Sequence, residues 1–308
     1  MKLITRKMPN NFNLFLVGDD HIGNLLRYDK GISKLFDMLC SSWGGVSEKH
    51  NYVIHHGDMI EAICVQDKRF DPAICTEPIP FEQANYAIKE YEPIKNKLIT
   101  ILDGNHPYKL HQFGNLTKYI CDGLGVEYGT WSSKVIFNDM KNKLMFKSFH
   151  THGNKTINST CDDIKRRKVN MKLSLKRALR DLCGDVALSA CGHSHKLLVC
   201  DPEPELYMTD DGKDLKQGYT LSQYLTREFV DKKTKQKANN PDKNLYTRGY
   251  VHPDYRWYVN TGSFLKTFEL GVSSYSERAG YANAEMGIIV VEVRDKFITN
   301  VRPINFFD

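Results

Sequence analysis

The sequence has 308 residues, of which 41% are hydrophobic, so it is long enough for one large domain. Its net charge of +6 permits a polyanionic partner without requiring one. The eight cysteines are scattered without a Cys-x-x-Cys pair, and no apolar run reaches the roughly 18 residues of a membrane span. These features exclude a disulfide-rich scaffold and a membrane partner, and we expect a cytoplasmic protein with reduced thiols.

The predicted elements alternate between strands and helices in the first part of the chain. Strands are expected at residues 13–17, 52–55, 98–102, 134–137, 144–149, 185–190, 257–260 and 287–293. Helices are expected at residues 25–39, 81–98 and 110–124. Turn residues at 138–139 and 294–296 predict hairpins. The pattern is typical of an α/β chain with mixed sheets.

One segment interrupts this pattern. Residues from about 201 to 254 are rich in Pro, Asp, Lys, Asn and Tyr and show little apolar periodicity. We interpret the segment as a surface insertion within a single domain that spans residues 1–308.

Five short polar motifs stand where predicted strands end. They occupy residues 18–23 (GDDHIG), 57–61 (GDMIE), 104–106 (GNH), 150–153 (HTHG) and 192–195 (GHSH). Because the carboxyl ends of neighbouring strands converge on one crevice in open α/β sheets, these motifs can meet in space. Asp19 and His21 are two residues apart, as are His193 and His195, and this spacing places side chains on the same side of an extended chain.

The side chains of these motifs are suited to binding metal. A mixture of imidazole nitrogen with carboxylate and amide oxygen favours Mn, Fe, Zn, Co or Ni over Ca or Mg. A carboxylate such as Asp58 can bridge two ions, and ions roughly 3.5–4 Å apart can clamp the attacking and leaving oxygens of a phosphoryl group. A lone His or Asp is usually structural, but that interpretation does not explain the joint pattern. We expect two divalent metal ions, with Mn as the first choice.

The order of the motifs, D-x-H, G-D-x-x-E, G-N-H, H-G and G-H-x-H, resembles that of the calcineurin-like metallophosphoesterase superfamily between Asp19 and His195. Residues 260–263 (NTGS) are similar to a turn found in many members. The resemblance implies a four-layer α-β-β-α sandwich with two mixed β-sheets. It also implies that the protein hydrolyses a phosphoester through a metal-bridging hydroxide.

The resemblance further implies a ligand set for each ion and a catalytic histidine. One ion would take Asp19, His21, Asp58 and His195, and the other would take Asp58, Asn105, His152 and His193. His106 would stabilise the transition state or protonate the leaving oxygen.

Two features depart from the family pattern. Many members follow Gly-Asn-His with an acidic residue that orients the histidine, but here Pro107 follows, so another acceptor must hold His106; Asp103 is one candidate. The fourth motif offers His150 and His152, which should point to the same side. We favour His152 as the ligand because His-Gly is the family pairing, and we expect His150 to support it.

Three side chains near Asp58 are candidates for supporting roles. His55 and His56 stand at the end of the second predicted strand, beside Asp58, and are expected to donate to the site or pack beside it rather than bind metal. Glu61 could contact a ligand histidine, or it could be a solvated acid at the start of a helix.

Residues 161–184 predict a helix with an apolar stripe and a basic face. The stripe comprises Ile164, Met171, Leu175, Leu179 and Leu182. The basic residues are Lys165, Arg166, Arg167, Lys168, Lys172, Lys176, Arg177 and Arg180. The basic face is either a solvated surface or a nucleic-acid contact through Arg166, Arg167 and Lys168. The insertion is open to the same two interpretations, a solvated surface or a nucleic-acid contact, because basic and aromatic side chains can bind a single nucleic-acid strand. Its basic and aromatic residues are Tyr219, Tyr224, Lys232, Lys233, Lys235, Lys237, Lys243, Tyr246, Arg248 and Tyr250.

The motifs also narrow the substrate. The second motif lacks the Asp-Arg-Gly of the Ser/Thr protein phosphatases in this superfamily, which argues against a phosphoprotein. The NTGS turn and the Gly-His-x-His ending are similar to the phosphodiesterase and DNA-repair exonuclease branch. A phosphodiester, in a nuclease-like reaction or another, is therefore the first expectation. The alternatives are a phosphomonoesterase acting on a small metabolite or nucleotide, and a non-catalytic nucleic-acid-binding or scaffold module.

Overall fold

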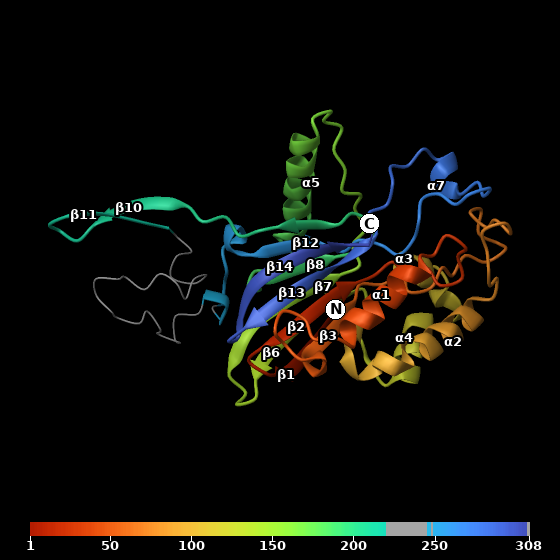
Figure 1. Ribbon diagram of the computed structural model, residues 1–308, viewed down its shortest axis with the longest axis horizontal. Coiled ribbons are helices and arrows are strands. Elements are labelled where there is room, and N and C mark those ends of the chain that lie inside the picture. Colours follow the sequence, from red (N-terminus) through yellow and green to blue (C-terminus); the bar gives the residue numbers. More distant parts are fainter. Residues whose placement is uncertain (220–244, 248, 307–308) are drawn as a thin grey trace.

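The computed structural model describes residues 1–219, 245–247 and 249–306, and its body contains two six-stranded sheets with flanking helices (Figure 1). The first sheet contains, in spatial order, β1 (Lys2–Met8), β6 (Ser132–Asp139), β7 (Leu144–Thr151), β8 (Leu188–Cys191), β12 (Trp257–Asn260) and β9 (Leu198–Cys200). The second contains β14 (Phe297–Asn305), β13 (Gly287–Arg294), β2 (Phe12–Val17), β3 (Asn51–His55), β4 (Leu98–Ile101) and β5 (Glu127–Tyr128). Both sheets combine parallel and antiparallel neighbours, so the expected α/β class with mixed sheets is confirmed.

The two sheets face each other across a hydrophobic core. Leu14 and Leu16 of β2 pack in this core with Phe137 of β6. Phe15 and Val17, which alternate with them, pack in a second core on the opposite face of the same strand. Because both faces of β2 are covered, the strand is apolar without interruption from Leu14 to Val17, as is usual for a central strand.

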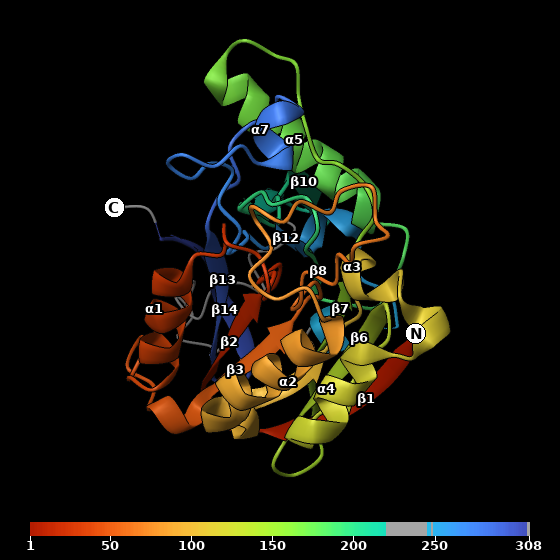
Figure 2. The ribbon, with the colours of Figure 1, turned by 90° about the vertical axis from the view of Figure 1, so that its right-hand side faces the viewer.

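Helices cover the outer faces of both sheets (Figure 2). The second core joins the second sheet to α1 (Asp29–Leu39), α2 (Pro80–Tyr91) and α4 (Leu116–Leu124). On the first sheet, Leu175 and Leu179 of α5 (Ile164–Leu179) pack against Tyr258 of β12. The shorter helices are α3 (Asn105–Tyr108), α7 (Tyr275–Arg278) and the 3-10 turns η1 (Glu48–His50), η2 (Glu92–Lys97), η3 (His111–Phe113), η5 (Leu245–Thr247) and η6 (Pro253–Tyr255).

Several element boundaries differ from those predicted. The helix expected over 81–98 ends at Tyr91 and continues as 3-10 turns, because Pro93 lacks a backbone donor. Strand β6 runs through Asp139, so its hairpin turn falls at residues 140–143. The turn between β13 and β14 lies where it was expected, with positive φ at Asp295 and Lys296. Strands β1, β5, β9 and β14 were not predicted.

Helix α5 packs over less of its length than its apolar stripe predicts. Leu175 and Leu179 are buried, but Ile164 is 77% exposed and Leu182, beyond the helix end, is 56% exposed. All residues from 162 to 170 are exposed. The N-terminal half of α5 therefore projects from the body of the molecule (Figure 1).

The described part of the insertion contains secondary structure and a buried side chain that were not predicted. A hairpin of β10 (Leu206–Asp210) and β11 (Leu215–Tyr219) extends away from the large sheets (Figure 1). Tyr246 is buried in the core between the sheets, so the segment is not entirely a surface feature. The predicted nucleic-acid contacts that lie outside the described residues are Tyr224, Lys232, Lys233, Lys235, Lys237, Lys243 and Arg248.

Two further expectations concern the whole chain. All eight cysteines fall within the described residues, and each is a free thiol. In the same part of the chain, no helix combines the length and apolar character required to cross a bilayer.

Candidate metal centre

The five polar motifs follow strands that are neighbours in the sheets. In the second sheet, β2, β3 and β4 are adjacent and parallel, and in the first sheet β7 and β8 are adjacent and parallel. Their carboxyl ends meet at one side of the molecule, where α3 lies beside the ends of β7 and β8 (Figure 2). The sheet topology thus brings the motifs together.

Three groups of side chains at this place could hold a metal ion, since the ligand atoms of each group lie within 4.8 Å of one another. The first group is Asp19, His21 and His195, the second group is Asp58, His152 and His193, and the third is His21, Glu61 and His106. The first two groups contain six of the seven predicted ligands.

Asn105, the seventh predicted ligand, joins the second group. Its Oδ1 lies 2.8 Å from His152 Nε2 and 2.7 Å from His193 Nδ1. The backbone N–H of His193 also donates to Asp19 Oδ2 at 3.0 Å, which connects the second group to the first. The two groups therefore form one continuous centre.

The backbone at the centre adopts an uncommon conformation. Five of the ten non-glycine residues with positive φ in the described chain are predicted ligands, with φ between 48° and 68°: Asp19, His21, Asp58, His193 and His195. The extended geometry expected for the two i, i+2 pairs is therefore wrong, because β2 and β8 end before these residues. Each such residue costs about 1–3 kcal/mol, and this strain commonly gathers at functional sites.

Two glycines make the close packing of the centre possible. A Cβ on Gly104 would lie 1.9 Å from Asp58 Oδ1. Gly57 has a φ of +98°, and a Cβ there would lie 2.4 Å from the Asp103 carbonyl oxygen. Any side chain at either position would displace the turn that carries Asp58.

Partners on the far side of two imidazoles orient them toward the centre. His21 Nδ1 lies 2.7 Å from Glu61 Oε2, and His152 Nδ1 donates to the His56 carbonyl oxygen at 2.7 Å. Glu61 thus contacts a ligand histidine, as considered, whereas His56 accepts through its backbone carbonyl instead of donating to the site. His21 Nε2 and Asp19 Oδ1 are buried without a hydrogen bond, although Asp19 Oδ1 lies 3.4 Å from His195 Nε2. Buried polar atoms seldom lack partners, so both atoms fit the role of cation ligands.

His106 is held by a different acceptor from the one considered. Its Nδ1 donates to the Glu61 carbonyl oxygen at 2.7 Å, and a carbonyl can only accept, so this nitrogen carries the proton. The carboxylate of Asp103 is hydrogen-bonded to the Tyr128 hydroxyl, so the interpretation of Asp103 as the partner of His106 is wrong. The Glu61 carbonyl is thus the acceptor for His106, which the Pro107 side chain cannot be.

His150 lies behind the centre and outside the three groups. Its Nδ1 is 3.0 Å from His56 Nε2, and its Nε2 is 2.6 Å from Ser148 Oγ. Burial lowers the pKa of His150 well below its usual value, which keeps the ring neutral. It contacts the His56 side chain, and the His56 carbonyl in turn accepts from His152, so His150 supports the centre indirectly.

Charges at the centre are strongly coupled. Burial lowers the pKa of His21, but the carboxylates of Glu61, Asp58 and Asp19 together raise it to about 9. Burial also lowers the pKa of His152, and Asp58, Asp19 and the His56 carbonyl together raise it to about 9. In the ion-free protein both imidazoles hold protons at neutral pH that a metal ion must displace.

A buried network behind Asp58 includes His55, which was expected to support the site, and also Asp20 and Tyr91, which were not predicted. The Tyr91 hydroxyl donates to Asp20 Oδ2 at 2.5 Å, and Asp20 Oδ1 lies 3.2 Å from His55 Nε2. His55 Nδ1 accepts the Gly57 N–H at 3.2 Å, which fixes the turn before Asp58. Asp20 was visible only as the second acid of an Asp-Asp pair, which loops often contain.

The turn after β12 supports the centre from the first sheet. Asn260 Oδ1 accepts a hydrogen bond from Ser194 Oγ at 2.9 Å, and Ser263 Oγ donates to the Asp19 carbonyl at 3.1 Å. These contacts hold the two loops that carry the first group.

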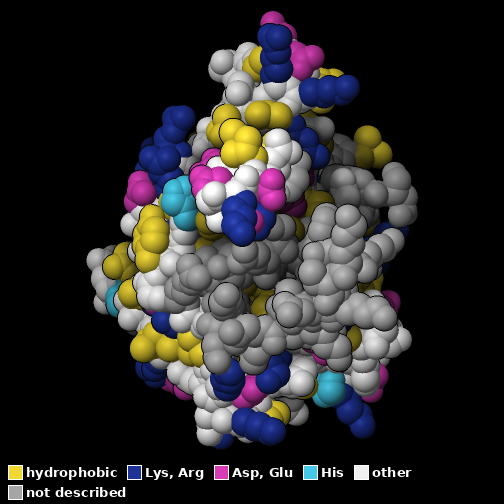
Figure 3. Space-filling model, turned by 90° about the vertical axis from the view of Figure 1, so that its left-hand side faces the viewer, with side chains coloured by type: hydrophobic (Ala, Val, Ile, Leu, Met, Phe, Trp, Pro, Cys, Tyr) yellow, Lys and Arg dark blue, Asp and Glu magenta, His cyan; other side chains and the backbone are white. Residues whose placement is uncertain are grey.

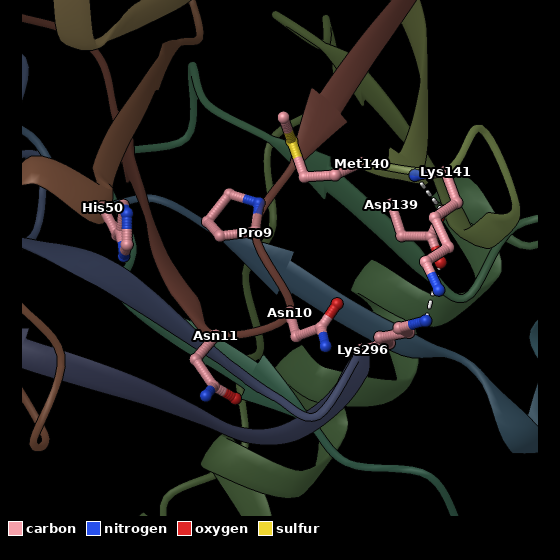
Figure 4. Close-up of a pocket in the computed structure, with 8 residues that line it drawn as sticks. All are labelled: Pro9, Asn10, Asn11, His50, Asp139, Met140, Lys141 and Lys296. Atoms are coloured by element: carbon pink, nitrogen blue, oxygen red, sulfur yellow. Dashed lines mark hydrogen bonds and ion pairs between the residues drawn. The ribbon is translucent and has the colours of Figure 1, made fainter.

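A cavity with a volume of about 520 Å³ lies at the opposite end of the strands (Figure 4). It is lined by turn residues: Pro9, Asn10, Asn11, His50, Asp139, Met140, Lys141 and Lys296. Its acid, Asp139, is already paired with Lys296 Nζ at 2.6 Å. None of the metal-type groups of the described residues falls within it.

No protein-family model matches this sequence, and no curated protein gives a significant match. Evidence for the function of the protein therefore comes from the residues of the centre.

Proposed function

We propose that the protein is a calcineurin-like metallophosphoesterase that binds two divalent metal ions and hydrolyses a phosphodiester. The observation that carries this proposal is the pair of ligand groups, each with two imidazoles and a carboxylate, connected by the hydrogen bond from the His193 N–H to Asp19 Oδ2. Asn105 adds an amide oxygen to the second group. The two facing mixed sheets with helices on both outer faces support the four-layer sandwich of that superfamily.

In this proposal the first group together with Asp58 holds one ion, and the second group together with Asn105 holds the other. The nitrogen and oxygen donors suit Mn, with Fe, Zn, Co or Ni as alternatives. When bound, the ions would supply Lewis-acid activation of water and stabilise charge on the attacking and leaving oxygens.

His106 would move the proton of the leaving group. Its Nδ1 is fixed on the Glu61 carbonyl, so Nε2 is the atom that can exchange a proton with an ester oxygen. Its ring lies 4.7 Å from that of His21, which places it at the edge of the first group rather than within it.

The N-terminal half of α5 favours a nucleic-acid strand as the diester. Lys172 and Lys176 pair with Asp201 and Asp254, whereas Arg166 and Lys168 make no ion pair within the described chain. Cations in the first turn oppose the helix dipole, so they do not stabilise the helix. On the face shown in Figure 3, blue Lys and Arg side chains are interspersed with magenta Asp and Glu, so the described residues of that face form no uniformly basic surface. The proposal of a nucleic-acid substrate therefore depends on Arg166 and Lys168 of α5.

A panel of phosphate esters tests the function. The protein loaded with Mn²⁺ is expected to hydrolyse bis-p-nitrophenyl phosphate and single-stranded DNA, and a chelator should abolish both activities. Turnover of p-nitrophenyl phosphate alone would favour the monoesterase. Two bound ions without turnover of any ester, cyclic nucleotides included, would favour the non-catalytic module.

A further inference from the structure

An arginine at the rim of the centre is not explained by metal binding. Arg69 Nη1 lies 3.4 Å from His106 Nε2. Because His106 Nδ1 donates to the Glu61 carbonyl, Nε2 is the acceptor in the neutral ring and Arg69 is the donor. The Arg69 side chain is only 18% exposed, so its charge is directed toward the centre rather than toward bulk water.

Asp67 fixes the orientation of this guanidinium. Arg69 Nε and Nη2 lie 3.1 and 2.8 Å from the two oxygens of Asp67, and the Arg69 backbone N–H donates to the same carboxylate at 2.9 Å. A bidentate pair of this kind restrains the planar group and leaves the Nη1 donors for a second partner.

The loop that carries Arg69 is tied to the body at several points. The Leu25 N–H donates to the Ile74 carbonyl at 2.8 Å, and the Thr76 N–H donates to the Gly23 carbonyl at 2.9 Å. Arg278, at the end of α7, pairs with Asp71 at 2.9 Å. Arg69 is therefore held in place before any substrate binds.

The charge of Arg69 is poorly matched by its surroundings once cations occupy the centre. Asp67 is its bidentate partner and also lies 3.5 Å from Lys109 Nζ. A fixed guanidinium close to two divalent ions is repelled by them unless an anion lies between. A tetrahedral oxyanion satisfies both sides, because it offers oxygens to the ions and to a guanidinium fork.

We propose that Arg69 forms a phosphoryl-binding site with the metal centre, in which its Nη donors hold a non-bridging oxygen of the substrate. This inference rests on the proposed function and deepens it. When the phosphoryl group binds, Arg69 transfers its hydrogen bond from His106 Nε2 to the phosphate oxygen. His106 Nε2 is then free to take up a proton from water, and the resulting imidazolium can donate it to the leaving oxygen as the ester bond breaks.

Binding of inorganic phosphate to the Mn²⁺-loaded protein, followed by titration calorimetry, tests this site without turnover. Arg69→Gln is expected to weaken phosphate binding about 10- to 100-fold, the value of a lost hydrogen bond to a charged group, while both ions remain bound. Arg69→Lys should recover part of the loss, because it keeps the charge without the fork. Lys109→Gln is the matched control, since Lys109 contacts the same Asp67 but is 48% exposed, and it should bind phosphate like the wild type.

The outcomes separate this site from the proposed function. Wild-type affinity in an Arg69→Gln protein that holds both ions would overturn the role of Arg69 and leave the phosphoesterase proposal intact. A wild-type protein that binds two ions but no phosphate would overturn both. If Arg69→Gln fails to fold, Asp67→Asn decides instead: releasing the clamp should weaken phosphate binding several-fold, and an unchanged affinity would overturn the proposal.

Discussion

The two ends of the sheets differ in what they bury. At the amino ends of β2 and β3, a cavity of about 520 Å³ is lined by turn residues, and its one acid is paired with a lysine. The carboxyl ends instead gather two carboxylates, an amide and four imidazoles on a strained backbone. At the carboxyl ends, His21 Nε2 and Asp19 Oδ1 are buried without a hydrogen bond, and both are atoms that can bind a cation. The residue types at the carboxyl ends, rather than the presence of a cavity, therefore mark the candidate site.

The largest difference between the two ends of the sheets is expected when Asp58, at the carboxyl ends, and Asp139, at the amino ends, are substituted separately. Asp58→Ala is expected to lose both ions and all measurable hydrolysis, because the proposed assignment makes Asp58 a ligand of both ions. Asp139→Asn, in the cavity at the amino ends, should keep wild-type metal content and rate. Metal analysis and ester turnover measure both. A single ion bound normally in Asp58→Ala would contradict the bridging role.

Substitution of His106 separates catalysis from metal binding at the carboxyl ends of the strands. His106→Asn should retain both ions and lose on the order of 10²–10⁴ in rate, the usual range for acid–base catalysis. The loss should be greatest for esters with poor leaving groups, since these need protonation most. An unchanged rate with an alkyl diester would exclude His106 from the reaction.

The pKa values of the ligand imidazoles predict how metal binding depends on pH. The pKa of His21 and that of His152 are raised to about 9 in the ion-free protein, so both rings are protonated at neutral pH. Metal affinity should fall as the pH falls below 9, by up to tenfold per unit for each proton displaced. Calorimetry in buffers of different ionisation enthalpy should detect about two protons released near pH 7.5. Binding without proton release would contradict the ligand assignment.

The smallest expected effect concerns α5. Arg166→Glu combined with Lys168→Glu should weaken single-stranded DNA binding. The slope of log binding constant against log salt concentration should become less steep by about 0.7 for each lost phosphate contact. Turnover of bis-p-nitrophenyl phosphate should not change, since a small ester reaches few of these charges. Lys141→Glu, at the opposite end of the sheets, is the control. DNA binding that is insensitive to salt would leave the basic half of α5 as a solvated surface.

Local sequence patterns predicted the parts of the molecule that are defined locally. Apolar runs marked the central strands, and the polar motifs after them marked the place where the strands end. Asp19 and His195 are separated by most of the chain, yet the order of parallel strands was sufficient to expect them at one crevice.

The sequence was least informative where tertiary packing decides the outcome. The apolar stripe of α5 does not reveal how far the sheet beneath it extends, so Ile164 was placed in a core that it does not reach. The partner of His106 is a backbone carbonyl, which no residue type encodes. Arg69 and Asp67 lie in a loop without periodicity, so no local pattern distinguishes them from surface charges.

The metal stoichiometry of the wild-type protein tests the central claim most directly. After loading with Mn²⁺ and removal of free ions by gel filtration, elemental analysis should find two ions per chain. His21→Ala, which removes a ligand of only one ion in the proposed assignment, should leave one. A wild-type protein that retains no ion, or only one, would contradict the dinuclear centre.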